Sequence, residues 1–207
     1  SPDVYPADNF PLATDVGDMD GDGDLDWVIS CYLGDWYFYV NDGDGNFTFQ
    51  EEIFAPVAAS CAVMMDIDND GDLDLVTSHG RVLRGITHSM AAGSRHWKPY
   101  AEEDHLFLND GQGRFRIDGK SGFATRIGVS RGLAGGDLDN DGDIDLYVTN
   151  FGNDTFYRNE GNGTYFEATQ STGLNNIEWG SSAAFFDGDL DGWLDLYVAN
   201  YVEYTVD

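Results

Sequence analysis

Basic residues are scarce in this sequence and are confined to its middle. Only 10 of the 207 residues are Lys or Arg, whereas 38 are Asp or Glu, and the formal net charge is −28. All ten basic residues lie between Arg81 and Arg158, so residues 1–80 and 159–207 carry none. A surface this acidic repels a phosphate backbone, and we therefore expect no nucleic-acid partner.

Long apolar runs are also missing. The longest nearly apolar stretch, residues 57–65, has about nine residues, whereas a transmembrane helix needs roughly twenty. We therefore expect no insertion into a membrane. The high charge does not by itself predict disorder, because hydrophobic residues make up 42% of the chain and aromatic residues 14%, which is enough for a core.

Cysteine is nearly absent, with Cys31 and Cys61 the two in the chain. Cys31 is expected to end one strand and Cys61 to begin a strand of the next repeat, which places both near the same face. A disulfide and a pair of buried thiols are both compatible with this placement.

One motif, in contrast, is abundant in the sequence. Asp-x-Asp-x-Asp-Gly-x-x-Asp occurs four times, beginning at Asp18, Asp66, Asp137 and Asp187. Side chains at positions 1, 3 and 5 of such a loop converge on one centre, and Gly at position 6 permits the turn. The carbonyl at position 7 and Asp at position 9 complete an all-oxygen shell. Such a cage favours Ca²⁺ over Mg²⁺, which demands a stricter octahedron.

The sequence thus predicts four calcium sites, one in each loop. The predicted ligands are Asp18, Asp20, Asp22, Asp24 and Asp26; Asp66, Asp68, Asp70, Asp72 and Asp74; Asp137, Asp139, Asp141, Asp143 and Asp145; and Asp187, Asp189, Asp191, Trp193 and Asp195. Position 7, occupied by Asp24, Asp72, Asp143 and Trp193, would bind through its backbone carbonyl. The fold should depend on calcium, because without it the carboxylates of each loop repel one another.

Two other readings of the motif are an EF-hand and an ordinary solvated turn. An EF-hand requires Glu at position 12 and a helix on each side. Position 12 is Ile29, Thr77, Val148 or Val198, each within a β-branched and aromatic run. These runs predict loops that join strand to strand. Four copies with the same Gly and the same final Asp argue against an ordinary turn.

The loops recur at spacings of 48, 71 and 50 residues, which indicates a repeat of about fifty residues with one insertion. That period is typical of propeller arrays. Within each unit a strand of small residues enters the loop, a buried strand leaves it, and a third strand ends in an Asn-acid-Gly-x-Gly turn before an aromatic residue. Such turns are strong hairpin signals. The turns begin at Asn41, Asn109 and Asn159 and lead to Phe47, Phe115 and Phe166.

The predicted fold is an all-β propeller with four-stranded antiparallel blades, of which about three and a half are present. Blade 1 spans about residues 8–55, blade 2 about 56–123 with an insertion at about 79–104, blade 3 about 126–172, and half of blade 4 about 177–207. An open stack exposes a sheet edge. Either the chain is a segment of a longer protein, or copies associate to cover that edge.

The aspartate loops and the Asn-acid-Gly-x-Gly-x-aromatic turns resemble the FG-GAP/VCBS repeats of integrin α-subunit propellers. The closest likeness is to the group that includes cartilage acidic protein and the bacterial UnbV-like proteins. It is carried by residues 106–111, 136–150 and 179–186 and covers nearly the whole chain outside the insertion. The resemblance implies a secreted or surface-exposed, calcium-stabilised propeller used for adhesion and recognition. It implies no particular catalytic activity.

The insertion is the most distinctive candidate for ligand contact. Loops joining second to third strands lie on the face opposite the aspartate loops, and the insertion joins two such strands. It is rich in cations and aromatic residues and lies beside all four histidines of the chain, His79, His88, His96 and His105. The candidate contacts for an acidic or glycan ligand are Arg95, His96, Trp97, Lys98 and Tyr100. A transition-metal site and a loop packed over its own blade are the alternatives.

Three Asn-x-Thr sequons, at Asn46, Asn153 and Asn162, are candidate glycosylation sites in a eukaryotic secretory pathway. Two of them lie in Gly-rich turns, where Asn and Thr are common for other reasons. Calcium loops of this class stay filled where calcium is abundant, which indicates a secreted, extracellular or cell-surface location.

The leading hypothesis is therefore a non-enzymatic, extracellular, calcium-stabilised propeller that binds a protein or glycan partner. One alternative is a structural subunit of an extracellular fibre or matrix, assembled through the open sheet edge. Another is an enzyme acting on acidic polysaccharides, with calcium as electrophile and His or Arg as base. Against it, no nucleophile motif and no paired carboxylates occur outside the loops.

Overall fold

The computed structural model describes residues 11–31, 35–54, 59–81, 91, 97–123 and 127–201. Four antiparallel sheets follow one another along the chain. The first contains β1 (Pro11–Gly17), β2 (Asp26–Cys31), β3 (Asp35–Asn41) and β4 (Phe47–Phe54). The second contains β5 (Ala59–Met65), β6 (Asp74–His79), β8 (His105–Asn109) and β9 (Phe115–Ile117). The third contains β11 (Ser130–Gly136), β12 (Asp145–Asn150), β13 (Thr155–Asn159) and β14 (Tyr165–Glu167).

The fourth sheet has two strands within the described residues, β15 (Gly180–Phe186) and β16 (Asp195–Asn200). A further two-stranded sheet pairs β7 (Glu102–Glu103) with β10 (Ile127–Gly128). Within the described ranges, helical structure is limited to the 3₁₀ turn η1 (Lys98–Tyr100) and the one-turn helix α1 (Thr169–Thr172). No described helix has the length and apolar character needed to cross a bilayer.

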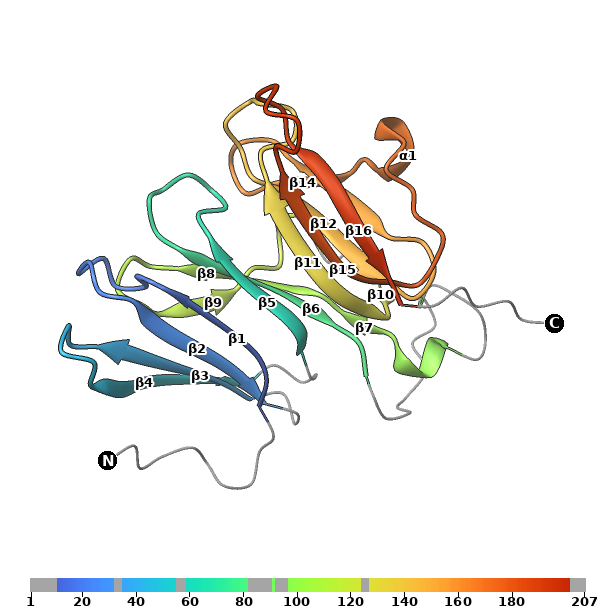
Figure 1. Ribbon diagram of the computed structural model, residues 1–207. Coiled ribbons are helices and arrows are strands. Elements are labelled where there is room, and N and C mark those ends of the chain that lie inside the picture. Colours follow the sequence, from blue (N-terminus) through green and yellow to red (C-terminus); the bar gives the residue numbers. More distant parts are fainter. Residues whose placement is uncertain are drawn as a thin grey trace.

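The sheets are arranged as propeller blades, and the first strand of each blade contacts the first strand of the next. β1 contacts β5, β5 contacts β11, and β11 contacts β15 (Figure 1). Strand order within the three full sheets follows the chain, as in an up-and-down blade. The predicted all-β fold of four-stranded antiparallel blades is confirmed, and the described blades form an open array rather than a closed ring.

Two apolar cores hold the blades together. Between the first and second blades, Trp36 and Phe38 meet Phe107 and Phe115, with the Phe38 and Phe115 rings stacked at 4.5 Å between centroids. Between the second and third blades lies a separate aliphatic and aromatic core containing Val76, Leu106, Leu133, Leu146, Val148 and Tyr157. Each core is thus shared by two blades, so a blade is stabilised chiefly by its neighbours.

The second strand of a blade shows how much burial depends on the neighbour. Every residue of β12 is buried, because blades cover both of its faces. β16 repeats nearly the same residues, yet its exposure alternates, because one face has no covering blade among the described residues. Tyr147 in β12 is 1% exposed, whereas the equivalent Tyr197 in β16 is 62% exposed.

The described part of the insertion lies between β6 and β8, at the end of the blade away from the aspartate loops (Figure 1). Arg81 forms an ion pair with Glu102 at its base. Trp97 reaches the next two blades: its ring lies 4.0 Å from that of Phe151 and 5.9 Å from that of Trp179, between centroids. At Trp97, the insertion therefore packs on the third blade and toward the fourth.

The two cysteines are not joined by a disulfide. Cys31 is buried at the end of β2, and Cys61 is half-buried in β5. Burial raises the pKa of the Cys61 thiol, so this group stays protonated near neutral pH. Of the two alternatives left open by the sequence, the structure shows the pair of thiols.

Candidate metal centres

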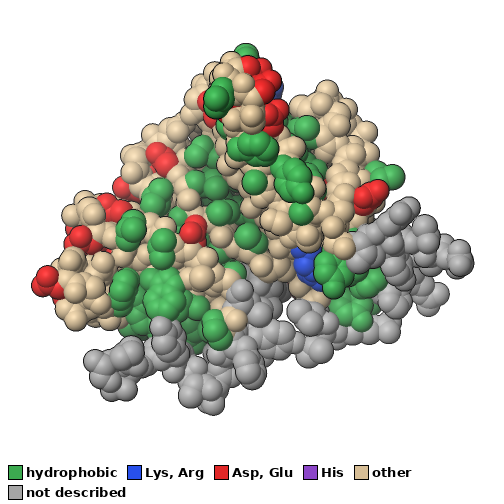
Figure 2. Space-filling view, viewed as in Figure 1, with side chains coloured by type: hydrophobic (Ala, Val, Ile, Leu, Met, Phe, Trp, Pro, Cys, Tyr) green, Lys and Arg blue, Asp and Glu red, His purple; other side chains and the backbone are tan. Residues whose placement is uncertain are grey.

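Each of the four aspartate loops brings three carboxylates together. The loops join β1 to β2, β5 to β6, β11 to β12 and β15 to β16, so they connect strand to strand as expected. In every loop the carboxylate oxygens at positions 1, 3 and 5 lie within 4.8 Å of one another. The groups are Asp18, Asp20 and Asp22; Asp66, Asp68 and Asp70; Asp137, Asp139 and Asp141; and Asp187, Asp189 and Asp191. These acidic loops lie at the tips of the blades (Figure 2).

Backbone conformation explains why these side chains converge. The glycine at position 6 has φ between +91° and +96° in all four loops, a region that other residues rarely adopt. Its N–H donates to the position-1 carboxylate at 3.0 or 3.1 Å, which turns that side chain inward. Position 4 is also left-handed, a requirement that the sequence motif did not reveal. It holds Gly21, Asn69, Asn140 or Leu190, with φ from +57° to +75°.

The second loop contains two carboxylate oxygens without a hydrogen-bond partner. Asp66 Oδ1 and Asp68 Oδ1 are both buried and have no hydrogen-bond partner. Burial, followed by repulsion from Asp70 and Asp66, raises the pKa of Asp68, and burial also leads the rise in the pKa of Asp20 and Asp139 at the same position. Oxygen atoms desolvated in this way need a positive partner. The donor set therefore fits a hard divalent cation such as Ca²⁺.

Position 9 lies outside these three-carboxylate groups, and its carboxylate contacts backbone amides. In the three full blades one oxygen accepts the N–H of position 2 and the other accepts the N–H of the Asn that ends the third strand. The pairs are Asp26 with Met19 and Asn41, Asp74 with Ile67 and Asn109, and Asp145 with Leu138 and Asn159, at 2.8 to 3.2 Å. In the fourth loop Asp195 accepts from Gly188 at 3.0 Å. Metal ligation by position 9 stays a prediction. Its hydrogen bonds, however, join the aspartate loop to the third strand of the blade.

Position 7 faces the second hairpin of its own blade. A Cβ on Gly43, Gly111 or Gly161 would come within 2.4 to 2.6 Å of the carboxylate of Asp24, Asp72 or Asp143, respectively. These glycines belong to the Asn-acid-Gly turns and have φ from +72° to +79°. The turn therefore needs glycine both for its backbone conformation and for the close approach of the aspartate loop.

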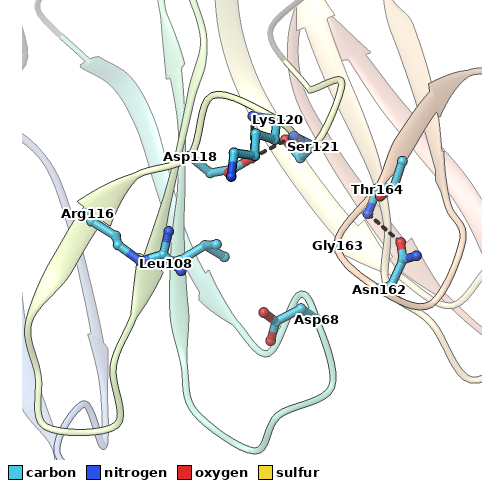
Figure 3. Close-up of a pocket in the computed structure, with 9 residues that line it drawn as sticks. All are labelled: Asp68, Leu108, Arg116, Asp118, Lys120, Ser121, Asn162, Gly163 and Thr164. Atoms are coloured by element: carbon cyan, nitrogen blue, oxygen red, sulfur yellow. Dashed lines mark hydrogen bonds between the residues drawn. The ribbon is translucent and has the colours of Figure 1, made fainter.

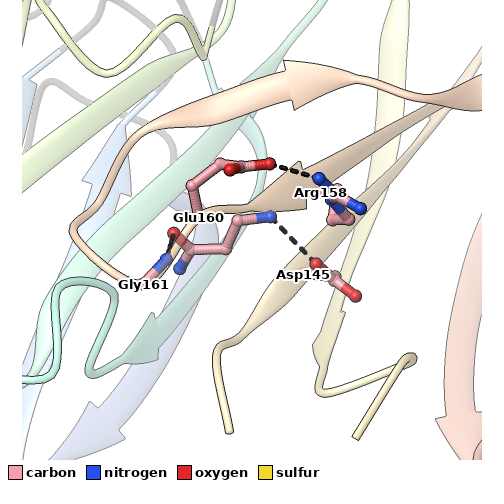
Figure 4. A network of polar contacts seen from close by, with 5 residues as sticks. Asp145, Arg158, Glu160 and Gly161 are labelled. Carbon is pink, nitrogen blue, oxygen red and sulfur yellow. Dashed lines mark hydrogen bonds and ion pairs between the residues drawn. The ribbon is translucent and has the colours of Figure 1, made fainter. Parts of the chain in front are cut away.

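In the second and third blades, the asparagine of the turn also connects consecutive blades. Asn159 Nδ2 donates to Ile67 O in the second loop at 2.9 Å and to Ile144 O in the third at 3.2 Å. Asn109 Nδ2 likewise donates to Met19 O at 2.8 Å and to Leu73 O at 3.0 Å. Figure 4 shows the turn of the third blade, with Asp145 below it and Arg158 paired with Glu160. One side-chain amide thus fixes the spacing between two neighbouring loops.

The position-9 carboxylates lead us to expect that the thermal stability of the protein depends on pH in calcium-free buffer. Burial raises the pKa of Asp74 from 3.8 to about 7 and that of Asp145 to about 6. Because these folded-state pKa values exceed those of the unfolded chain, the folded state binds more protons between roughly pH 4 and pH 7. The stability they contribute is full below pH ~4 and is lost as pH rises through 6 to 7. We expect the Tm without calcium to fall by about 5 °C or more between pH 5 and pH 8.

Differential scanning fluorimetry across this pH range measures the effect. Asp74→Asn serves as the control, since an amide cannot titrate, and its Tm should depend less on pH than that of the wild type. A wild-type Tm that rises between pH 5 and pH 8 in the absence of calcium would contradict the expectation.

The predicted contact residues of the insertion are only partly within the described residues. Arg95 and His96 lie outside them. Trp97, Lys98 and Tyr100 are half-buried around η1, and the Trp97 and Tyr100 rings lie 5.7 Å apart between centroids. Trp97 therefore has a packing role whatever else it contacts.

The histidines do not form a metal centre within the described part of the chain. His88 and His96 lie outside it. His79 is fully buried, its Nε2 lies 2.7 Å from the Thr77 hydroxyl oxygen, and its ring meets the edge of His105. Burial lowers the pKa of His105, which favours its neutral form. Among the described residues, the groups that could hold a metal ion consist of aspartates.

The three sequons lie in exposed positions. Asn46, Asn153 and Asn162 all have exposed side chains. Asn46 Nδ2 donates to Asp42 Oδ2 at 2.9 Å, and Asn162 Oδ1 accepts the N–H of Thr164 at 3.0 Å. Their glycosylation stays a prediction.

Comparison with known proteins gives a family and solved structures of low sequence identity. No curated protein matches the sequence. The Vibrio cholerae biofilm matrix protein Bap1 is 17% identical with a TM-score of 0.47; the alignment covers 95% of this chain and 31% of Bap1. An Agrocybe aegerita lectin that recognises non-reducing terminal N-acetylglucosamine is 20% identical with a TM-score of 0.44, over 87% of this chain and 44% of the lectin.

The present chain thus spans less than half the length of either solved structure. The FG-GAP-like repeat matches residues 18–77 and 137–198, which together make up more than half of the sequence and include all four aspartate loops. With its blades, its loops and its hairpin turns, the chain belongs to the family of FG-GAP-like repeat proteins.

Proposed function

We propose that this protein is an extracellular calcium-binding propeller that recognises a protein or glycan partner, with calcium in a structural role. The observation that carries the proposal is the convergence of three carboxylates in each of four loops, with two buried oxygens of the second loop lacking any partner. Bound calcium would supply positive charge there. Since extracellular calcium is abundant, loops of this kind stay occupied outside the cell.

The structural role follows from what surrounds the loops. The side chains at positions 1, 3 and 5 would hold the ion, while position 9 and the turn asparagine connect the same loop to its own blade and to the next. Ordering one loop therefore helps to order two blades. Because the loops serve the fold in this way, we assign them no catalytic step and propose that the protein is a binding protein rather than an enzyme.

Recognition is assigned to the face opposite the loops, where the insertion adds cations and aromatic rings to an acidic body. Lys98 belongs to the 3₁₀ turn η1, and its neighbour Trp97 packs on Phe151 and Trp179. This packing supports the insertion on the third and fourth blades. A supported loop loses less conformational entropy when it binds a partner.

A double variant, Arg95→Ala with Lys98→Ala, tests this assignment on arrays of acidic and neutral glycans and on extracellular protein partners in calcium buffer. We expect binding to fall by about tenfold or more, because charge-assisted contacts are lost, while the Tm stays unchanged. Arg114→Ala, an exposed cation next to the turn of the second blade, is the matched control and should bind as the wild type does.

Trp97→Ala is a less specific variant, since the loss of ring packing should lower the Tm as well as the affinity. Wild-type affinity in the Arg95 and Lys98 double variant would remove the insertion from the recognition surface.

Assembly into a matrix is the second candidate function, and one observation favours it. The fourth sheet exposes a row of large apolar side chains, including Phe186, Trp193, Tyr197 and Tyr201, at 48 to 69%. Exposed apolar surface of this kind is typical of sites that meet another protein. Light scattering over a range of protein concentrations separates assembly through this sheet from recognition by a monomer.

A further inference from the structure

A polar pocket lies between the second and third blades, beside the second aspartate loop. It has a volume of about 250 Å³ and opens between β9 with its following turn on one side and the β13–β14 turn on the other (Figure 3). The volume lies just below the roughly 300 Å³ at which pockets for drug-sized ligands begin. A single small ligand, rather than a large cofactor, fits this space.

Two of the ten basic residues of the chain line this pocket, although the protein as a whole is strongly acidic. Arg116 comes from β9, and Lys120 comes from the turn that follows it. Both side chains are exposed, and Figure 3 shows them on the same wall. Cations placed in a pocket on an acidic protein favour an anionic ligand.

The pocket also contains two carboxylates, Asp118 and Asp68. Asp118 accepts the N–H of Ser121 at 2.7 Å and that of Lys120 at 3.1 Å, so its charge is engaged by the backbone. Asp68 belongs to the second calcium loop, where a bound cation would offset its charge. Although burial raises it, the pKa of Asp118 is lowered by these hydrogen bonds and then by the charge of Arg116. With a cation in the second loop, the pocket would hold the two cations Arg116 and Lys120 against the single unbalanced carboxylate of Asp118.

The opposite wall carries neutral polar groups, and one more lies on the wall of Lys120. Asn162 and Thr164 lie on the β13–β14 turn, and Ser121 lies at the base of the facing turn. An amide and two hydroxyl groups can donate and accept hydrogen bonds with the hydroxyl groups of a ligand. None of the residues that line the pocket is aromatic, so a neutral sugar would have no ring on which to stack.

Both walls are held in place by contacts between the blades. The N–H of Tyr165 donates to Ser121 O, which connects the third blade to the turn that carries Lys120. A Cβ on Gly163 would lie 3.2 Å from the Asp68 Cβ, so the β13–β14 turn packs directly on the second aspartate loop. The pocket is thus formed in the folded protein before any ligand arrives, which lowers the entropic cost of binding.

We propose that this pocket binds an acidic sugar through a carboxylate held by Arg116 and Lys120 and hydroxyl groups held by Asn162 and Thr164. The inference goes beyond the proposed recognition by the insertion, because it assigns a second binding site, beside the second aspartate loop. Charge complementarity selects the carboxylate, and the neutral wall selects the hydroxyl-rich ring.

Ligand-observed NMR with D-glucuronate, in calcium buffer and on the full chain, tests the proposal. We expect D-glucuronate to bind, and D-glucose to bind about tenfold or more weakly because it lacks the carboxylate. Arg116→Gln with Lys120→Gln should weaken D-glucuronate binding by a similar factor. Arg114→Gln is the matched control, because Arg114 is an exposed cation just before β9 that does not line the pocket, and it should leave binding unchanged.

Three outcomes would overturn the proposal: no binding of D-glucuronate by the wild type, equal binding by the Arg116 and Lys120 double variant, or equal binding of inorganic sulfate. The last would leave a simple anion site. A Tm measured for each variant excludes unfolding as the cause of a loss. If the pocket does not bind D-glucuronate, the proposed recognition by the insertion is not affected, because it is tested separately with the Arg95 and Lys98 double variant.

Discussion

Chelation of calcium is expected to lower the Tm of this protein by roughly 20 °C or more, or to unfold it at room temperature. A ligand present at a hundred times its Kd stabilises the folded state by about 2.7 kcal/mol for each site, so four sites contribute about 11 kcal/mol. In a domain of this size each kcal/mol corresponds to about 2–4 °C in Tm. Loss of the ions would also leave three carboxylates within 4.8 Å of one another in every loop.

Thermal melts in calcium, in magnesium and in a calcium chelator measure this effect. Magnesium should restore less of the Tm than calcium, because it requires a stricter octahedral geometry. Asp70→Asn, which changes a single carboxylate of the second loop, should lower the calcium stoichiometry and the calcium-dependent part of the Tm. A Tm that does not respond to chelation would end the structural-calcium proposal.

Asp145→Ala is expected to destabilise the protein by about 2–5 kcal/mol, which is the second largest effect. Asp145 is 1% exposed, and its carboxylate accepts two backbone N–H groups, from Leu138 and from Asn159. Alanine would leave both of these donors without their partner, and a buried unsatisfied donor costs about 1–3 kcal/mol. The expected fall in Tm is roughly 5–15 °C.

The repeat supplies a matched control for this substitution. Asp195 occupies position 9 of the fourth loop, is exposed, and accepts from Gly188. Asp195→Ala should therefore cost only about 1 kcal/mol. Urea unfolding in calcium buffer compares the two variants, and equal destabilisation would refute the role assigned to the backbone contacts of Asp145.

Calcium stoichiometry separates the two roles of position 9. Asp145→Asn keeps a carbonyl acceptor for one of the two N–H groups and leaves positions 1, 3 and 5 unchanged. We expect this variant to bind as many calcium ions as the wild type. A stoichiometry lower by one would show that position 9 is itself a ligand, as the sequence motif predicts.

Local features could be predicted from the sequence because they depend on a few neighbouring residues. Position 12 held Ile29 or Val148 instead of glutamate, which excluded the EF-hand and indicated strands after the loops. The invariant glycine at position 6 predicted a turn that only left-handed backbone allows, and its φ lies near +95°. The spacing of the loops predicted blades, since a repeat of about fifty residues holds four strands.

Other features could not be read from the sequence, because they join residues far apart in the chain. Asn159 marks a hairpin turn in the sequence, but its side chain also bonds to Ile67, 92 residues away, and so connects two blades. The pocket likewise needs Arg116 from one blade and Asn162 from the next. No local pattern indicates such a meeting, since it depends on how neighbouring blades are aligned.

The sequence by itself determined the kind of repeat, the strand order within a blade and the three carboxylates that converge in each loop, because all of these are set within about ten to fifty residues. Tertiary structure alone decided which residues are buried and which are exposed. The same motif gives a tyrosine that is 1% exposed at position 147 and one that is 62% exposed at position 197. The difference is the presence of a neighbouring blade, because burial in a propeller comes from the contact between blades.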